Sequence, residues 1–224
     1  MPDFSWMDAG TAYFAARFDG ADLYADSALP GWTRRHVVAH VAANARGLGR
    51  LAHWAATGEE TPMYASAQAR NAEIEELATL PPEALVALFE QTAADFRAAL
   101  LSLTASQWEV PVRTAQGAVV PASEIVWMRC REVWIHGVDL GTGGGFADFP
   151  PDLLDALLAD VTTRWERRGE EHAPVLITTD TKATFRSGDA KGPEVYGTAA
   201  ELAAWVTGRG PAPHPGAPAI GGWL

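Results

Sequence analysis

The sequence has little cysteine, little positive charge and no long apolar run. Cys130 is its one cysteine, which excludes a disulfide framework and a zinc site built on cysteines. The 17 Lys and Arg residues are outnumbered by 28 Asp and Glu residues, so the net charge is −11. This charge argues against a nucleic-acid partner, because phosphate binding draws most of its affinity from a basic surface.

Membrane and export signals are also missing from the sequence. No stretch approaches the ~18 apolar residues of a membrane span, and no basic segment followed by an apolar core opens the chain. We therefore expect no membrane partner and, with a single cysteine, a location in the reducing cytoplasm. Hydrophobic residues at 48% and charged residues at 20% exclude wholesale disorder and indicate globular structure.

The first 140 residues have the apolar spacing of helices. Between residues 32 and 56, apolar side chains recur with a period close to 3.6, after a break at Pro30-Gly31 and before a stop at Gly58. Similar patterns cover residues 3–18, 82–103 and 121–140. Four long helices predict a four-helix bundle, with long connections after the second helix and around residues 104–120.

The sequence changes character after Thr142-Gly-Gly-Gly145. We interpret this glycine cluster as a linker rather than a phosphate loop, because a helix and not a strand precedes it. Beyond it we expect one helix over 151–168, two β-rich runs at 175–179 and 183–186, and a short helix near 198–207. The predicted fold is therefore mostly α, with a four-helix-bundle domain at 1–145 and a small α+β domain at 146–224.

Helical geometry sorts the histidines of the second predicted helix. At 100° per residue, His40 lies about 60°, His36 about 100° and His53 about 160° from the centre of the apolar stripe. We expect His40 to point inward, His36 to lie at the rim and His53 to face solvent. A single inward histidine is more often a hydrogen-bonded core residue than a ligand, so His40 alone does not define a site.

The predicted helix over 121–140 carries a narrow polar stripe on an otherwise apolar surface. Arg129, Glu132, His136 and Asp139 fall within roughly 80° of one another. The stripe is either a solvated edge with i,i+3 and i,i+4 pairs or a polar seam that faces inward. In the second case Glu132 and His136, one turn apart, suit two ligands of one metal ion.

His40 on a facing helix would complete a His/Glu/His set. Three nitrogen and oxygen ligands with one open position are the pattern of catalytic rather than structural zinc. His36 would close the site as a fourth ligand, but its rim position disfavours this. A Glu-x-x-x-His spacing also recurs by chance on helices, so the spacing alone leaves the metal site a hypothesis.

Two long blocks of the sequence resemble a known family. One runs from Gly31 through His40 to Tyr64, and the other joins Thr114-Ala-Gln-Gly117 to the stretch that ends at Leu140. A weaker match includes Thr207-Gly-Arg-Gly210 and the terminal Trp-Leu. In these blocks the sequence is similar to the mycothiol-dependent maleylpyruvate isomerases of gentisate catabolism.

The resemblance implies a fold, a reaction and a set of residues. The fold is a DinB-like four-helix bundle followed by a small α+β domain that closes the active site. The metal is Zn²⁺, with ligands His40, Glu132 and His136, and a catalytic arginine of the second domain maps onto Arg209. The reaction turns cis maleylpyruvate, a dicarboxylate, into trans fumarylpyruvate with the low-molecular-weight thiol mycothiol as cofactor.

A thiol cofactor fits the chemistry of this sequence. A cis double bond cannot rotate, so a nucleophile must add to it and leave again after rotation. Cys130 lies about 160° from Glu132 around the helix and is expected to be a buried structural residue. A thiol supplied by a cofactor, ionised by zinc, would take its place.

Several residues near the expected site keep two interpretations. Arg209 is the expected carboxylate clamp, through its bidentate guanidinium. Arg129 is either a second clamp or an ion-pair partner of Glu132 or Asp139. Asp139 either orients a ligand histidine or has a surface or helix-end role. Four tryptophans near the ends of the ligand helices are mainly core, and any one could form a wall of the cofactor site: Trp32, Trp54, Trp127 and Trp134.

Two other functions compete with the isomerase. A mycothiol S-transferase of the same bundle family would share the zinc but attach the thiol to an electrophile, and a non-enzymatic module would use the His/Glu/His set structurally. The full ligand set and Arg209 disfavour the non-enzymatic module. The match around residues 59–64 and 114–117 favours the isomerase over the transferase. We expect a monomer, because no interface pattern is evident.

Overall fold

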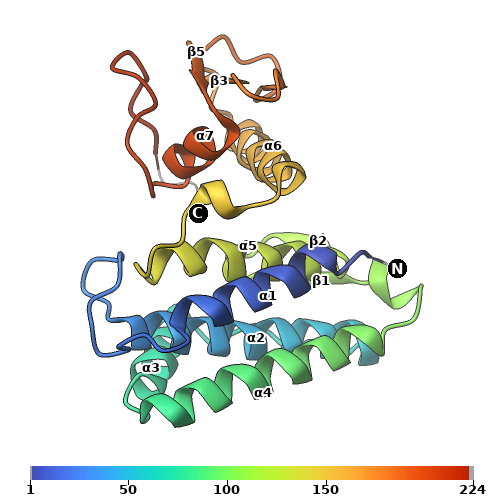
Figure 1. Cartoon of the computed structure of the whole chain (residues 1–224). Helices are drawn as coiled ribbons and strands as arrows, with labels where there is room; N and C mark the ends of the chain where they lie inside the picture. The colour runs from blue at the N-terminus through green and yellow to red at the C-terminus, as the bar shows by residue number, and fades with distance from the viewer. Residues whose placement is uncertain (1, 222–224) are drawn as a thin grey trace. The chain divides into compact units, whose positions relative to one another are not determined.

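The computed structural model describes residues 2–221, which form two compact units that divide between Gly144 and Gly145 (Figure 1). The terminal Trp-Leu that contributes to the family resemblance lies outside the described residues. The fold is mostly α, with small sheets, as the sequence predicts. None of the helices within residues 2–221 is long and apolar enough to cross a membrane.

Four long helices build the first unit, and all four are confirmed. They are α1 (Ser5–Phe18), α2 (Arg34–Thr57), α4 (Pro82–Leu101) and α5 (Glu124–Asp139). Helices α1 and α5 pack against each other, α2 packs against α4, and α2 also contacts α5 (Figure 1). Apolar side chains from three of these helices meet in a buried core that includes Leu48, Leu51, Phe96, Leu100 and Ile125.

Two glycines set how closely α1 approaches α5. A Cβ atom at Gly10 would lie 2.5 Å from Trp134 Nε1, and one at Gly137 would lie 2.5 Å from Tyr13 Cε1. Tyr13 and Trp134 stack with their ring centroids 4.8 Å apart. The ring stack therefore depends on the absence of side chains at both glycines, and it holds the outer face of α5 in place.

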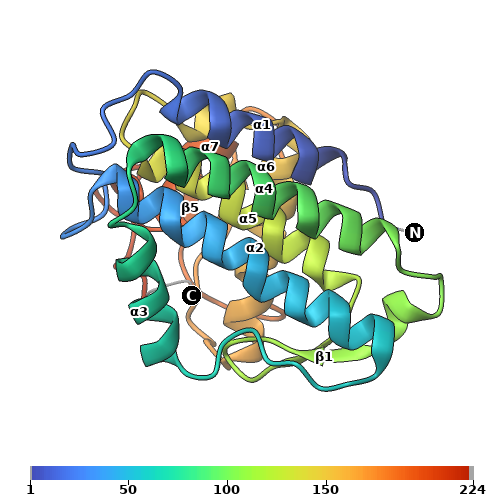
Figure 2. The ribbon, with the colours of Figure 1, turned by 90° about the horizontal axis from the view of Figure 1, so that it is seen from below.

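The two long connections of the bundle contain structure that the sequence analysis missed. Helix α3 (Ala67–Leu77) follows α2 and lies alongside it (Figure 2). Its first turn is capped by the Ser66 hydroxyl, which accepts a hydrogen bond from the Ala69 N–H at 3.0 Å. The second connection forms an antiparallel hairpin of β1 (Pro111–Arg113) and β2 (Val119–Pro121). Consequently α5 starts at Glu124 rather than at Pro121.

The second unit is a small α+β fold. Strand β3 (Val175–Thr178) is central, with β4 (Thr184–Phe185) antiparallel on one side and β5 (Glu194–Gly197) parallel on the other. Helices α6 (Pro151–Arg167) and α7 (Ala199–Val206) pack against each other. Both helices and the first two strands follow the sequence prediction, whereas β5 was not predicted.

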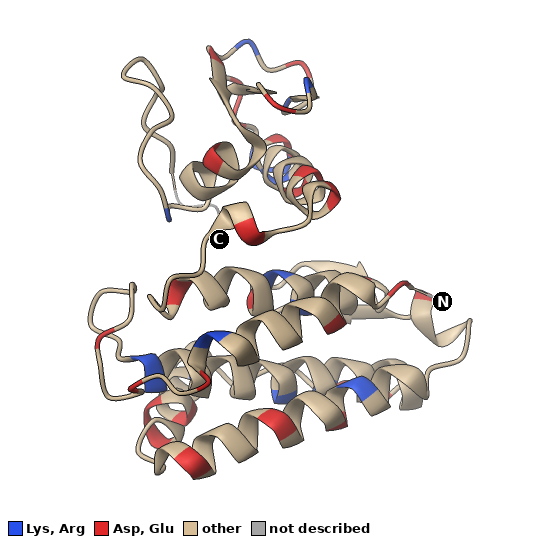
Figure 3. Cartoon of the chain, in the orientation of Figure 1, with Lys and Arg blue, Asp and Glu red and all other residues tan. Residues whose placement is uncertain are grey.

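Acidic residues occur in helices of both units. Figure 3 shows Asp and Glu in red along α4 and α6, with few blue Lys and Arg residues between them. Basic residues gather at the start of α2, where Arg34 and Arg35 stand together. The net charge of −11 is spread over helices and loops, and it leaves room for cations at particular places.

Candidate metal centre

Helix α2 is positioned by its first turn. The Thr33 N–H donates to His36 Nδ1 at 3.2 Å, so His36 serves the helix N-terminus, and His36 Nε2 lies 3.4 Å from Glu75 Oε2. Arg34 then donates to the carbonyl oxygens of Leu140 and Gly141, at the end of α5, at 3.0 and 3.3 Å. These contacts tie the start of α2 to the end of α5, which brings His40 to the level of His136.

The three histidines of α2 have the predicted exposures. His40 is buried at 3%, His36 is intermediate and His53 is exposed. On α5, Arg129 and Asp139 are each only 1% exposed. The polar stripe of α5 is therefore an inward seam, and the alternative of a solvated edge is wrong.

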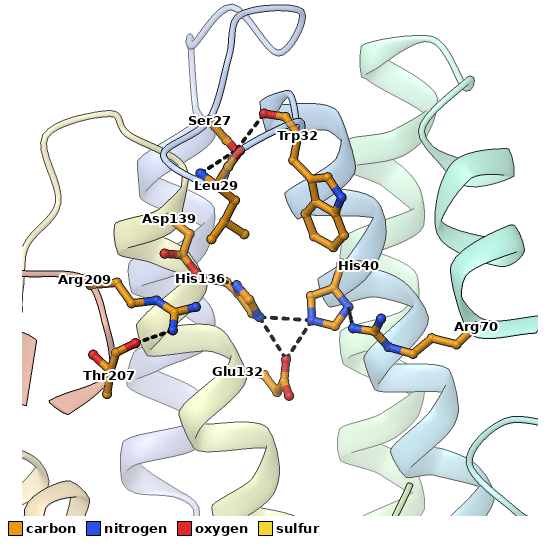
Figure 4. Close-up of polar contacts among 10 residues, drawn as sticks. All are labelled: Ser27, Leu29, Trp32, His40, Arg70, Glu132, His136, Asp139, Thr207 and Arg209. Carbon is orange, nitrogen blue, oxygen red and sulfur yellow. Dashed lines mark hydrogen bonds and ion pairs between the residues drawn. The ribbon is translucent and has the colours of Figure 1, made fainter. Parts of the chain in front are cut away.

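The side chains of His40, Glu132 and His136 converge on one point (Figure 4). Glu132 Oε2 lies 2.9 Å from His40 Nε2 and 3.2 Å from His136 Nε2, and the two Nε2 atoms are 3.0 Å apart. Bonds of 2.0–2.1 Å in a tetrahedral zinc site place neighbouring ligand atoms roughly 3.3 Å apart. The donor atoms and their spacing therefore fit one divalent metal ion, with Glu132 and His136 partly open to solvent.

His40 and His136 have pKa values shifted in opposite directions. Burial, followed by the charge of His136, lowers the pKa of His40 to about 4. Burial also opposes the charged form of His136, but hydrogen bonds with Asp139 and Glu132 overcome it and raise its pKa to about 9. Burial alone would raise the pKa of Glu132, yet hydrogen bonds with His136 and His40 hold it well below its usual range. Glu132 is thus ionised at neutral pH.

The Nδ1 atoms of the two histidines, which face away from Glu132, have partners of opposite charge (Figure 4). His136 Nδ1 lies 2.8 Å from Asp139 Oδ2, a carboxylate that fixes the ring and leaves Nε2 to face the cluster. His40 Nδ1 lies 3.2 Å from Nη2 of Arg70, a guanidinium that can only donate. Of the two roles weighed for Asp139, the structure supports the orientation of a ligand histidine.

The contacts of Arg129 differ from the ion pair considered for it in the sequence analysis. Its Nη1 donates to the Val41 carbonyl oxygen at 2.7 Å and to Asn44 Oδ1 at 3.0 Å, and it forms no ion pair with Glu132 or Asp139. Burial lowers the pKa of Arg129 to about 10. The guanidinium is 1% exposed and joins α5 to α2 inside the bundle.

Cys130 is not a nucleophile of this site. The side chain is 2% exposed in the core, and burial raises the pKa of its thiol to about 12. A thiol with that pKa stays protonated at neutral pH, and the thiolate is the reactive form. The structural role expected for Cys130 follows from these two facts.

One aromatic ring lies beside the cluster, and another lines a cavity next to α2. Of the four tryptophans considered, Trp32 approaches a ligand, with its ring centroid 5.8 Å from that of His40. Tyr64 packs against α2 at Gly47, where a Cβ atom would lie 3.1 Å from the tyrosine Oη. Tyr64 also lines a cavity of about 370 Å³ between α2, the following loop and α3. Burial, followed by the charge of Glu132, raises the pKa of Tyr64 to about 12.

Arg209 belongs to the second unit. Gly208, at φ +75°, ends α7, and the Arg209 N–H donates to the Ala204 carbonyl oxygen at 2.8 Å. The side chain is half-buried, and its Nη1 donates to the Thr207 carbonyl oxygen at 2.6 Å. A glycine turn and two hydrogen bonds therefore define the conformation of Arg209 after α7.

Comparison with models of protein families shows which family the chain belongs to. The family model described as the mycothiol maleylpyruvate isomerase N-terminal domain matches residues 7–141, and the model for the C-terminal domain of the same family matches residues 148–222. The chain belongs to the mycothiol-dependent maleylpyruvate isomerase family. The family resemblance inferred from the two sequence blocks is thereby confirmed.

Solved structures agree with this family assignment. A crystal structure of the mycothiol-dependent maleylpyruvate isomerase is 38% identical in sequence, with a TM-score of 0.86, and the match covers 94% of each chain. A structure of a histidine-to-alanine variant of that isomerase matches with the same values. Among curated proteins, none matches the chain.

Arg70 contacts His40 in this site and was not predicted from the sequence. The sequence did carry a signal for its helix, since Ser66 is a good N-cap and the alanines, glutamates and leucine that follow are strong helix formers. The contact with His40, in contrast, depends on how α3 lies against α2. No spacing along the chain predicts that arrangement.

Proposed function

We propose that the protein isomerises maleylpyruvate to fumarylpyruvate with mycothiol as cofactor and Zn²⁺ as the metal ion. The observation that supports this most is the convergence of His40, Glu132 and His136 within a chain 38% identical to a mycothiol-dependent maleylpyruvate isomerase. We further propose that it acts in gentisate catabolism, as a cytoplasmic monomer.

The residues of the cluster hold the metal and set its charge. His40 and His136 would offer neutral nitrogens and Glu132 an ionised oxygen, while Asp139 keeps the His136 ring in the orientation that a metal needs. When bound, a divalent ion supplies the positive charge that keeps a thiol ionised near neutral pH. Mycothiol would supply the nucleophile that lets the double bond rotate, and it would be released unchanged, so no thiol would be consumed.

Other residues would handle the substrate. We propose that Arg209 binds a substrate carboxylate through its guanidinium and that the small second domain, residues 146–224, closes the active site. Trp32 stands beside His40 as an apolar wall that excludes water from one side of the cluster. Cys130 has no part in the reaction, because its thiol is buried and protonated.

Metal analysis and activity together test this proposal. Purified protein should contain about one zinc per chain and isomerise maleylpyruvate only when mycothiol is added. His40→Ala and Glu132→Gln should lose the metal and the activity, whereas Cys130→Ala should keep both. A zinc-loaded protein that leaves maleylpyruvate unchanged but consumes mycothiol with an electrophile would be an S-transferase, and metal retained in His40→Ala would disprove the ligand assignment.

A further inference from the structure

The hydrogen bond between Arg70 and His40 is incompatible with a metal at His40. Arginine only donates, so in this bond His40 Nδ1 carries a lone pair and the ring proton resides on Nε2. A metal ion needs the lone pair of Nε2, which moves the ring proton to Nδ1. Two donors would then face each other, and the contact with Arg70 would break.

Arg70 has no carboxylate to hold it in place. Within residues 2–221, its other side-chain hydrogen bond runs from Nη1 to Oδ1 of the neighbouring Asn71, at 3.1 Å, and no ion pair is formed. Arg70 is half-buried on α3, a helix with a single buried residue, Ile74. The guanidinium can therefore leave His40 without breaking an ion pair or disturbing a core.

Arg70 is a cation that lies beside the cluster, within hydrogen-bond distance of His40. Because it forms no ion pair within residues 2–221, its guanidinium suits a carboxylate of a bound molecule.

We propose that Arg70 is a substrate-binding residue that metal loading releases from His40, and that it then binds one carboxylate of the substrate. This inference rests on the proposed function, because it takes the substrate to be a dicarboxylate. It assigns a residue of the bundle to one carboxylate, while Arg209 of the second unit is proposed for the other.

A structural role for Arg70 makes the opposite prediction for metal affinity. If Arg70 supports His40 as a ligand, then its loss should weaken metal binding about 10- to 100-fold, as is usual for the outer partner of a ligand. If metal binding must displace Arg70, then its loss should leave metal affinity unchanged or increase it. Asp139, the outer partner of His136, provides the matched control within the same site.

The test compares Arg70→Gln with Asp139→Asn by calorimetry. Zn²⁺ is titrated into chelator-treated full-length protein, and maleate, a simple cis dicarboxylate, is titrated into the zinc-loaded protein. We expect Arg70→Gln to bind zinc at least as tightly as wild type and Asp139→Asn to bind it about 10- to 100-fold more weakly. Zinc-loaded Arg70→Gln should bind maleate at least about 10-fold more weakly and show a matching rise in KM, with Arg70→Lys in between.

Each other outcome is decisive. Zinc binding by Arg70→Gln as weak as that of Asp139→Asn would make Arg70 a support for His40 and overturn the inference. Unchanged maleate binding and an unchanged KM in Arg70→Gln would also overturn the inference. A zinc-loaded wild-type protein that does not bind maleate would overturn it as well. If Arg70→Gln alone loses maleate binding while wild type leaves maleylpyruvate unchanged, the proposed reaction fails and the carboxylate site at Arg70 stands.

Discussion

His136 and His40 present the same atom, Nε2, to Glu132, yet their surroundings differ. His136 stands on α5, buried on most sides, with Asp139 accepting at its outer nitrogen, and its pKa is raised to about 9. His40 has Arg70, from the short and exposed α3, at its outer nitrogen, and its pKa is lowered to about 4. For the proposed metal, the His136 ring is already oriented, whereas His40 would have to exchange a partner first.

This difference suggests that the two histidines have different roles in one site. In the proposed site the His136 side would hold the metal, with Asp139 as its permanent partner. The His40 side would couple the metal to Arg70, because a metal at His40 would free Arg70 to bind substrate. The following predictions sharpen or break this division, from the largest expected effect to the smallest.

Removal of the shared ligand should have the largest effect. Glu132 contacts both histidines, so Glu132→Gln should lower zinc affinity by more than the roughly 100-fold upper range for an outer partner, and should abolish isomerisation. Metal content after dialysis and initial rates would measure this. Cys130→Ala is the matched control on the same helix, and loss of metal from that variant would contradict the assignment.

The pH dependence of metal binding should follow His136. A proton competes with the metal for this side chain below its pKa of about 9, so zinc affinity should fall about tenfold for each pH unit below that value. His40, with its pKa of about 4, adds nothing above that pH. Titrations between pH 6 and pH 8 should therefore differ about 100-fold.

The Asp139→Asn variant tests the cause of this pH dependence. Asp139 supplies the first of the hydrogen bonds that raise the His136 pKa, so the steep region should move to lower pH in the variant. An unchanged profile would mean that another group releases the proton, and the contrast between the two histidines would then be lost.

Arg129 should affect stability rather than the site. Replacement by Met leaves the Val41 carbonyl and the Asn44 side chain without their donor, which costs about 1–3 kcal/mol in the free energy of unfolding. Urea denaturation would measure this loss, and zinc affinity should change little. A large rise in KM with unchanged stability would instead make Arg129 a substrate clamp, the role assigned above to Arg70.

His36 should have the smallest effect. Its ring accepts from the backbone at the start of α2, so His36→Ala should reduce stability by about 1 kcal/mol, as for the loss of a helix cap. Zinc affinity should be unchanged, because His36 lies outside the cluster of three ligands. A clear drop in metal content would reveal a fourth ligand.

The ligand cluster was predictable from the sequence because helical geometry governs it. A period of 3.6 places His40 on the inner face of its helix, and a spacing of four puts Glu132 and His136 on one face of theirs. The same arithmetic directs Cys130 away from Glu132, which agrees with its burial in the core.

The contacts of the two arginines were not predictable in this way. Arg129 was expected either to be a second carboxylate clamp or to pair with Glu132 or Asp139, but its Nη1 donates to the backbone and amide oxygens of α2. Arg70 reaches His40 from a helix that the sequence analysis treated as a connection. Both outcomes depend on the distance and rotation between packed helices, which local spacing does not encode.

The most direct test of the account follows the thiol during the reaction. Zinc-loaded protein is mixed with maleylpyruvate and a much smaller amount of mycothiol, and proton NMR follows the vinyl signals. The account predicts complete conversion from the cis to the trans coupling, with the free thiol undiminished at the end. Conversion that stops after one substrate per mycothiol, with the thiol held as a stable thioether, would contradict it.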